Sequence, residues 1–82
     1  NHNFKMPTAV AVTTIGKLTI STVNLNDAAF GSGMFETCVF YPNKDSSVVG
    51  RWASESEALI NHAKIVEHEI KHIVARNQLH VV

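Results

Sequence analysis

The sequence predicts an α+β fold, in which a small antiparallel sheet of two hairpins (about four strands) packs on one long C-terminal helix. Two observations predict it. The first two thirds of the chain contain short segments rich in β-branched and aromatic residues, joined in pairs by turn-forming residues. The last third instead repeats apolar residues at three- and four-residue steps, which is typical of an amphipathic helix.

The first hairpin is predicted over residues 9–23. Residues 9–15 (AVAVTTI) and 18–23 (LTISTV) are short and β-branched, and Gly16 and Lys17 between them suit a two-residue turn. Residues 24–33 (NLNDAAFGSG) follow, and their Asn, Asp and Gly residues indicate a loop.

The second hairpin is predicted from two strands, 34–41 (MFETCVFY) and 46–52 (SSVVGRW), around turn residues 42–45. A four-residue turn places Tyr41 opposite Ser46 and continues to Phe35 opposite Trp52. The same register sets Glu36 directly opposite Arg51. Opposite charges at facing positions contribute roughly 0.2–1 kcal/mol, so the charge pattern favours this register. Glu36 and Arg51 are therefore either a structural ion pair or binding residues.

The helix is predicted to begin at Ser54 and to end near residue 76. Ser54 and Glu57 form the S-x-x-E pattern of a capping box, and Asn77 is a suitable terminator. The tail, residues 79–82 (LHVV), is compatible with a short final strand. One apolar stripe along the helix is expected to pack on the sheet: Leu59, Ala63, Val66, Ile70 and Ile73.

Both faces of the second hairpin are apolar, and one helix covers only one face. The first predicted face holds Phe35, Val39, Tyr41, Val48 and Trp52, and the second holds Met34, Cys38, Phe40 and Val49 beside the charged pair. A large exposed apolar patch usually marks an interface, so we expect a homo-oligomer, most simply a symmetric dimer. The alternative is that loop 24–33 covers the second face within one chain.

Length and composition limit the classes of protein. Residues 6–82 are one domain, and residues 1–5 (NHNFK) are expected to be an appended segment. The formal net charge is zero without a basic tract, which argues against nucleic acid as a partner. The apolar run 8–23 is too polar for a membrane helix, and Cys38 alone fits a small buried residue in a reducing compartment. These features favour a soluble, cytoplasmic protein without a cofactor.

Residues 68–72 read HEIKH, which is the H-E-x-x-H signature of zinc proteases. Histidines at i and i+4 lie on one side of a helix, within reach of one Zn²⁺, and Glu69 could act as a base on a metal-bound water. At about 100° per residue, however, His68 and His72 lie roughly 160° from the centre of the predicted stripe. On that helix they face away from the core.

A catalytic zinc also needs a third protein ligand. His62 lies about 120° around the helix from His68, nearly two turns earlier, and His80 reaches the site only if the tail folds back. The small chain has no second subdomain to form a substrate cleft. We therefore interpret HEIKH as coincidental, with no metal site expected. If that interpretation fails, the ligands are His68 and His72, with Glu69 as the base.

Three short segments stand out as motifs: STVNL (21–25), FETCVF (35–40) and RWASESEALINH (51–62). Together they resemble a group of small bacteriophage-encoded proteins of uncharacterised function. The group's pattern is roughly S-T-V-x-L, a glycine-containing loop, F-E-T-x-V-F and R-Y-x-T-x-E-E-A-x-x-G-H. The matching residues are Ser21, Thr22, Val23, Leu25, Phe35, Glu36, Thr37, Val39, Phe40, Arg51, Glu57, Ala58 and His62.

The resemblance covers roughly residues 18–66 and departs from the pattern at Trp52, Ser54 and Asn61, where the group has Tyr, Thr and Gly. It carries no catalytic assignment, and HEIKH lies beyond it. It implies a phage accessory role, which small phage proteins often perform by binding a host protein, a defence component or a signalling nucleotide.

The leading hypothesis is a non-enzymatic phage accessory protein that acts by binding a host factor as a homo-oligomer in the host cytoplasm. Glu36, Arg51 and His62 are the candidate binding residues. Three alternatives stay open: an oligomer that sequesters a small signalling ligand such as a nucleotide, a zinc-dependent hydrolase using HEIKH, and a minor virion assembly protein.

Overall fold

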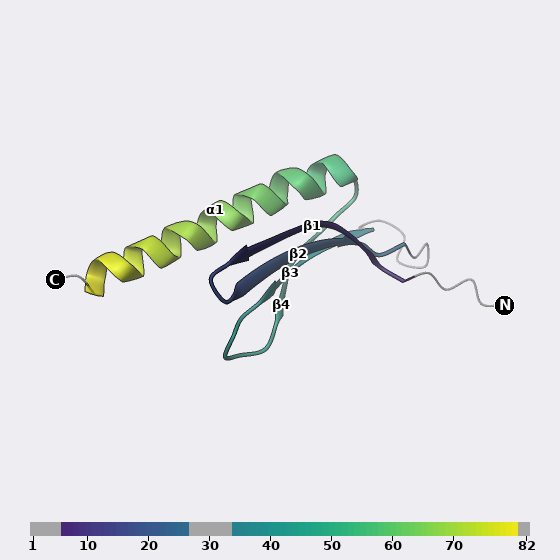
Figure 1. The fold of residues 1–82 in the computed structure, drawn as a ribbon. Helices are drawn as coiled ribbons and strands as arrows, with labels where there is room; N and C mark the ends of the chain where they lie inside the picture. The colour runs from purple at the N-terminus through teal and green to yellow at the C-terminus, as the bar shows by residue number, and fades with distance from the viewer. Residues whose placement is uncertain (1–5, 27–33, 81–82) are drawn as a thin grey trace.

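A computed structural model of the chain describes residues 6–26 and 34–80. Its elements are β1 (Thr8–Ile15), β2 (Leu18–Asn24), β3 (Phe35–Phe40), β4 (Ser47–Trp52) and α1 (Glu55–His80). The strands form one antiparallel sheet in the order β1-β2-β3-β4, so that strands adjacent in the chain are adjacent in the sheet. Figure 1 shows α1 along one face of this sheet. The predicted α+β class, with two hairpins and one C-terminal helix, is confirmed.

The first hairpin turns as predicted. Ile15 pairs with Leu18, which leaves Gly16 and Lys17 as the turn. Gly16 has a φ of 61°, in the left-handed region that glycine adopts without steric cost. Lys17 is thereby placed at the tip of the sheet.

The second hairpin confirms the start of the predicted register and corrects its continuation. Glu36 pairs with Arg51, as predicted, and Phe35 with Trp52. Beyond Thr37 the register shifts by one residue, so Cys38 pairs with Val48. The continuation to Tyr41 opposite Ser46 is therefore wrong. A bulge leaves one residue of β4 without a partner and moves Val48 off the face predicted for it.

Gly50 makes room for Trp52 on the face of the sheet that α1 covers. A Cβ atom built at Gly50 overlaps the six-membered ring of Trp52, so the ring occupies the space that a side chain would fill. The indole thus lies over the backbone of its own strand. From there its Nε1–H reaches Thr37 on β3 at 3.0 Å.

The hydrophobic core lies between the sheet and the first half of α1. Its fully or largely buried members are Leu18, Ile20, Phe35, Val39 and Ala58. Half-buried side chains of Ile15, Tyr41, Ile65 and Val66 pack against the cluster of Leu18, Ile20 and Val39. Such burial stabilises a domain by about 25 cal/mol per Å² of apolar surface, and here it holds α1 on the sheet.

The helix begins at the predicted N-cap, Ser54. Its Oγ accepts a hydrogen bond from Glu57 N at 3.2 Å, as in a capping box, whereas Glu57 Oε1 accepts one from Ala53 N at 3.3 Å, one residue before the N-cap. The helix passes the predicted end near residue 76 and continues for one further turn, through His80. Residues 79 and 80 are helical rather than part of a final strand, and residues 81–82 of that predicted strand lie outside the described residues.

The face of α1 that packs on the sheet differs from the predicted stripe. Ala58 and His62 are buried, and Ile65 and Val66 are half-buried, whereas Leu59 and Ile70 are 41% and 44% exposed. At about 100° per residue the buried face is rotated by roughly 70° from the prediction. Apolar residues occupy a broad arc of this helix. The small Ala58 side chain and the hydrogen bonds of His62 select one side of that arc.

Candidate functional site

His62 lies on the side of α1 that faces the sheet, where it is buried in a chain of hydrogen-bonded polar side chains. Its Nδ1 lies 2.7 Å from Thr22 Oγ1, and its Nε2 lies 2.9 Å from Thr13 Oγ1. Thr22 Oγ1 in turn lies 2.5 Å from Thr37 Oγ1, which also accepts the indole hydrogen of Trp52. Among the described residues no buried side-chain nitrogen or oxygen lacks a partner.

Trp52 Nε1 only donates, so Thr37 Oγ1 accepts its hydrogen. A threonine hydroxyl donates once and accepts twice, so the bonds from Thr37 to Thr22 and from Thr22 to His62 can run in either direction, and the His62 tautomer follows that direction. Burial lowers the pKa of His62, which favours the uncharged ring.

Glu36 and Arg51 lie on the opposite face of the sheet from His62. Arg51 Nε donates to Glu36 Oε2 at 2.9 Å, and the two side chains are 57% and 16% exposed, respectively. Thr37, the neighbour of Glu36, points to the helix side, and successive side chains of a strand point to opposite faces. The structure therefore brings Glu36 and Arg51 together and separates both from His62.

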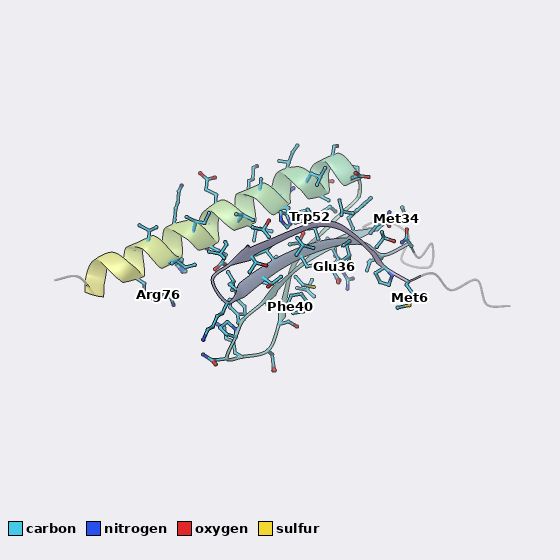
Figure 2. The ribbon with its side chains drawn as sticks, viewed as in Figure 1. Met6, Met34, Glu36, Phe40, Trp52 and Arg76 are labelled. Carbon is cyan, nitrogen blue, oxygen red and sulfur yellow. The ribbon has the colours of Figure 1, made fainter. Side chains whose placement is uncertain are left out.

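We call the uncovered side of the sheet the open face. The strand registers place on it Val12, Thr14, Thr19, Ser21, Val23, Glu36, Cys38, Phe40, Val48 and Arg51. Val12, Phe40 and Val48 are 57%, 46% and 54% exposed. Figure 2 shows Phe40 on the side of the sheet away from α1, and Trp52 near the helix. Most of loop 24–33, the predicted cover for this face, lies outside the described residues.

Cys38 lies near the middle of the open face and is half-buried, so the prediction of a buried cysteine holds only in part. Its Sγ lies 3.7 Å from Glu36 Oε1. Burial, and then the charge of Glu36, raise the pKa of the thiol. Because the thiolate is the nucleophilic form, this environment disfavours a catalytic role for Cys38.

A groove of about 670 Å³ opens where the second half of α1 passes the tips of both hairpins. From the first turn and its flanks come Ile15, Gly16, Lys17 and Leu18; from the second, Tyr41, Pro42, Asn43 and Lys44; and from α1, His68, Glu69, His72, Ile73 and Arg76. We call this site the groove.

The groove corrects the predicted placement of HEIKH. His68, Glu69 and His72 line it, so the two histidines, which are both exposed, lie on the flank of α1 and not on the face opposite the sheet as predicted. The error follows from the wrong choice of buried helix face. Relative to the observed face, His72 and His68 lie roughly 60° and 100° from its centre, which places them on its flank.

The two HEIKH rings lie side by side, with their centroids 5.1 Å apart. His62 does not join them, because both its ring nitrogens are hydrogen-bonded to threonines. In the part of the chain that the structure describes, no three His, Cys, Asp or Glu side chains are grouped so that they could hold a metal ion. A zinc on HEIKH would have two histidine ligands and needs a further one.

Sequence reasoning singled out His62 but missed its partners Thr13, Thr22 and Thr37. A signal for them exists, because Thr22 follows Ile20 by two positions and Thr37 lies midway between Phe35 and Val39. That period of two puts both threonines on the same face as core residues. A buried threonine needs a polar partner, and a buried histidine on a covering helix can supply one.

Most residues of the three sequence motifs in segments 21–25, 35–40 and 51–62 have structural roles. Phe35, Val39 and Ala58 are in the core, and Glu57 caps α1. Thr22, Thr37 and His62 form the buried polar chain, and Glu36 pairs with Arg51.

No helix within the described residues is long and apolar enough to cross a membrane. The comparisons with known proteins give no match: neither a protein-family model, nor a curated protein, nor a solved structure corresponds to this chain.

Proposed function

We propose that this protein is a non-enzymatic accessory protein of the bacteriophage type, which binds a host factor and associates with a second copy of itself through the open face. The observation that carries the proposal is the exposure of apolar side chains across the sheet. Val12, Ser21, Cys38 and Val48 form one continuous row over all four strands, and Phe40 lies beside it.

Single exposed apolar residues are common. Here Val12, Cys38, Val48 and Phe40 gather around the polar Ser21 on one uncovered face, and apolar side chains grouped in this way are typical of an interface. Two open faces related by a two-fold axis would pack as stacked sheets, about 10 Å apart. Glu36 and Arg51 border the row as a charged pair that fixes the orientation of the partner.

Native mass spectrometry on protein purified without chelator tests the association, because it reads chain number and bound mass together. We expect a dimer for the wild type and a monomer for Phe40→Asp. Ile60→Asp is the matched control, since Ile60 is 57% exposed on α1, away from the sheet. A monomeric wild type, or a dimer broken by Ile60→Asp and kept by Phe40→Asp, contradicts the proposed interface.

Arg51→Ala tests the binding role of the charged pair. We expect it to stay folded, with a loss of roughly 0.2–1 kcal/mol in the free energy of unfolding, and to lose capture of a partner from host lysate. Lys71→Ala is the control, because Lys71 forms an exposed pair with Glu67 on α1. If Arg51→Ala unfolds, or if both variants capture the partner equally well, the pair of Glu36 and Arg51 has a structural role and not a binding role.

The same spectra address the alternative of a zinc hydrolase. One zinc per chain, together with a hydrolytic activity that Glu69→Gln removes, would replace the binding function by catalysis at HEIKH. The dimer test is independent of this result, because the groove and the open face lie on opposite sides of the sheet.

A further inference from the structure

The groove arises because the helix is longer than the sheet it covers. The 26 residues of α1 span about 39 Å, whereas a strand of eight residues spans about 26 Å. Figure 1 shows the C-terminal part of α1 continuing beyond the hairpin turns. The overhanging helix and the two turns form its walls.

Positive charge is concentrated in the groove. The chain as a whole is neutral, with seven basic and seven acidic side chains. The groove nevertheless takes three of the basic ones (Lys17, Lys44 and Arg76) and one of the acidic ones, Glu69. Within the described residues none of these three cations forms an ion pair, so their charges are not neutralised by carboxylates. Figure 2 shows Arg76 on the side of α1 that faces the sheet.

The remaining lining suits an organic ligand. Ile15, Leu18 and Ile73 are apolar, and Tyr41 presents an aromatic ring with Lys44 Nζ 4.3 Å from its centroid. The volume of about 670 Å³ lies within the 300–1,000 Å³ typical of small-molecule sites. A site for a polymer would instead need a basic track that continues beyond one groove.

We propose that the groove binds a small phosphorylated ligand of nucleotide size. Arg76 donates two parallel hydrogen bonds to a phosphate, and Lys17 and Lys44 place point charges on it from the two turns. His68 and His72 add ring donors along the helix wall. The half-buried carboxylate of Glu69 accepts a hydrogen bond from a hydroxyl or amino group of the ligand.

This inference goes beyond the proposed function and does not depend on it. Ligand binding in the groove uses one chain, from the helix side of the sheet. Self-association uses the open face. Either proposal can therefore be contradicted without the other. Substitutions in the groove are expected to leave the number of chains in the assembly unchanged.

Calorimetric titration with adenosine diphosphate, pyrophosphate and adenosine, without divalent metal, tests the proposal. We expect adenosine diphosphate to bind more tightly than pyrophosphate, and adenosine alone not to bind. Lys17→Gln and Arg76→Gln should each weaken the binding of adenosine diphosphate about tenfold or more. Lys64→Gln, which removes the same charge from α1 outside the groove, should leave it unchanged.

Three results would overturn the site. One is the absence of binding by both phosphorylated probes at millimolar concentration. Another is an equal loss in Lys17→Gln, Arg76→Gln and Lys64→Gln, which would indicate general attraction of anions. The third is tighter binding of a single-stranded RNA oligonucleotide than of adenosine diphosphate, with sensitivity to Lys64→Gln. Thermal unfolding of each variant checks that the fold is retained.

Discussion

Thr22 is the side chain on which the buried polar chain depends most. It is fully buried and joins Thr37 to His62, so its removal leaves Thr37 bonded only to Trp52 and leaves His62 Nδ1 without its partner. We expect Thr22→Val to lower the free energy of unfolding by about 1–3 kcal/mol, measured by urea denaturation. Thr19→Val, on the open face of the same strand, should change it by less than about 0.5 kcal/mol. Similar losses in the free energy of unfolding for both variants would show that the buried hydrogen bonds do not contribute to stability.

His62 makes stability depend on pH. Because burial lowers the pKa of His62 in the folded protein, the unfolded chain binds the proton first as the pH falls. The stability from the neutral ring is complete above the ordinary histidine pKa of about 6.5, and it is lost as the pH falls from there through the lowered pKa. Urea midpoints at pH 7.5 and 5.5 should differ for the wild type and differ less for His62→Asn. An equal pH dependence in both proteins would assign the effect to other groups.

Gly50 and Trp52 act together within β4. Because the indole fills the space beside Gly50, we expect Gly50→Ala to lower the free energy of unfolding by about 1–3 kcal/mol through overpacking. In a Trp52→Leu background the same substitution should cost less, because the overlapping ring is gone. A double-mutant cycle measures the difference. If Gly50→Ala lowers stability equally in both backgrounds, the loss comes from the backbone at residue 50 and not from the ring of Trp52.

The choice of helix face is testable with two isoleucines. Ile65 packs against the core, whereas Ile70 is 44% exposed, although sequence periodicity placed Ile70 in the buried stripe. We expect Ile65→Ala to lower the free energy of unfolding by about 1–3 kcal/mol and Ile70→Ala by less than about 1 kcal/mol. A larger loss for Ile70→Ala than for Ile65→Ala would support the stripe predicted from the sequence, and with it the outward placement of His68 and His72.

At the level of the whole molecule, local patterns predicted the elements, whereas tertiary contacts decided how they face one another. The two-residue turn at Gly16, the capping box at Ser54 and the pairing of Glu36 with Arg51 follow from residues close together in the sequence or from one register. The bulge in β4 and the rotation of α1 do not. They depend on how Trp52 and His62 reach threonines on neighbouring strands, which the order of residues does not show.

The groove could not be predicted from the sequence for the same reason. HEIKH was visible in the sequence, but its direction depended on which side of α1 is buried. Lys17, Lys44 and Arg76 are spread along the chain and approach one another only when both turns lie under the helix. No local pattern could assign them to one groove.

The strand order has a consequence for how the protein is made. Each strand pairs with the one synthesised just before it, so the sheet forms through short loop closures of low entropic cost and is expected to form quickly. The helix that covers its inner face comes from the last third of the chain. At 5–20 residues per second, the 26 residues of this helix take roughly one to five seconds to translate. A sheet that forms before α1 docks exposes both of its faces, and the docking of His62 on Thr22 closes one of them.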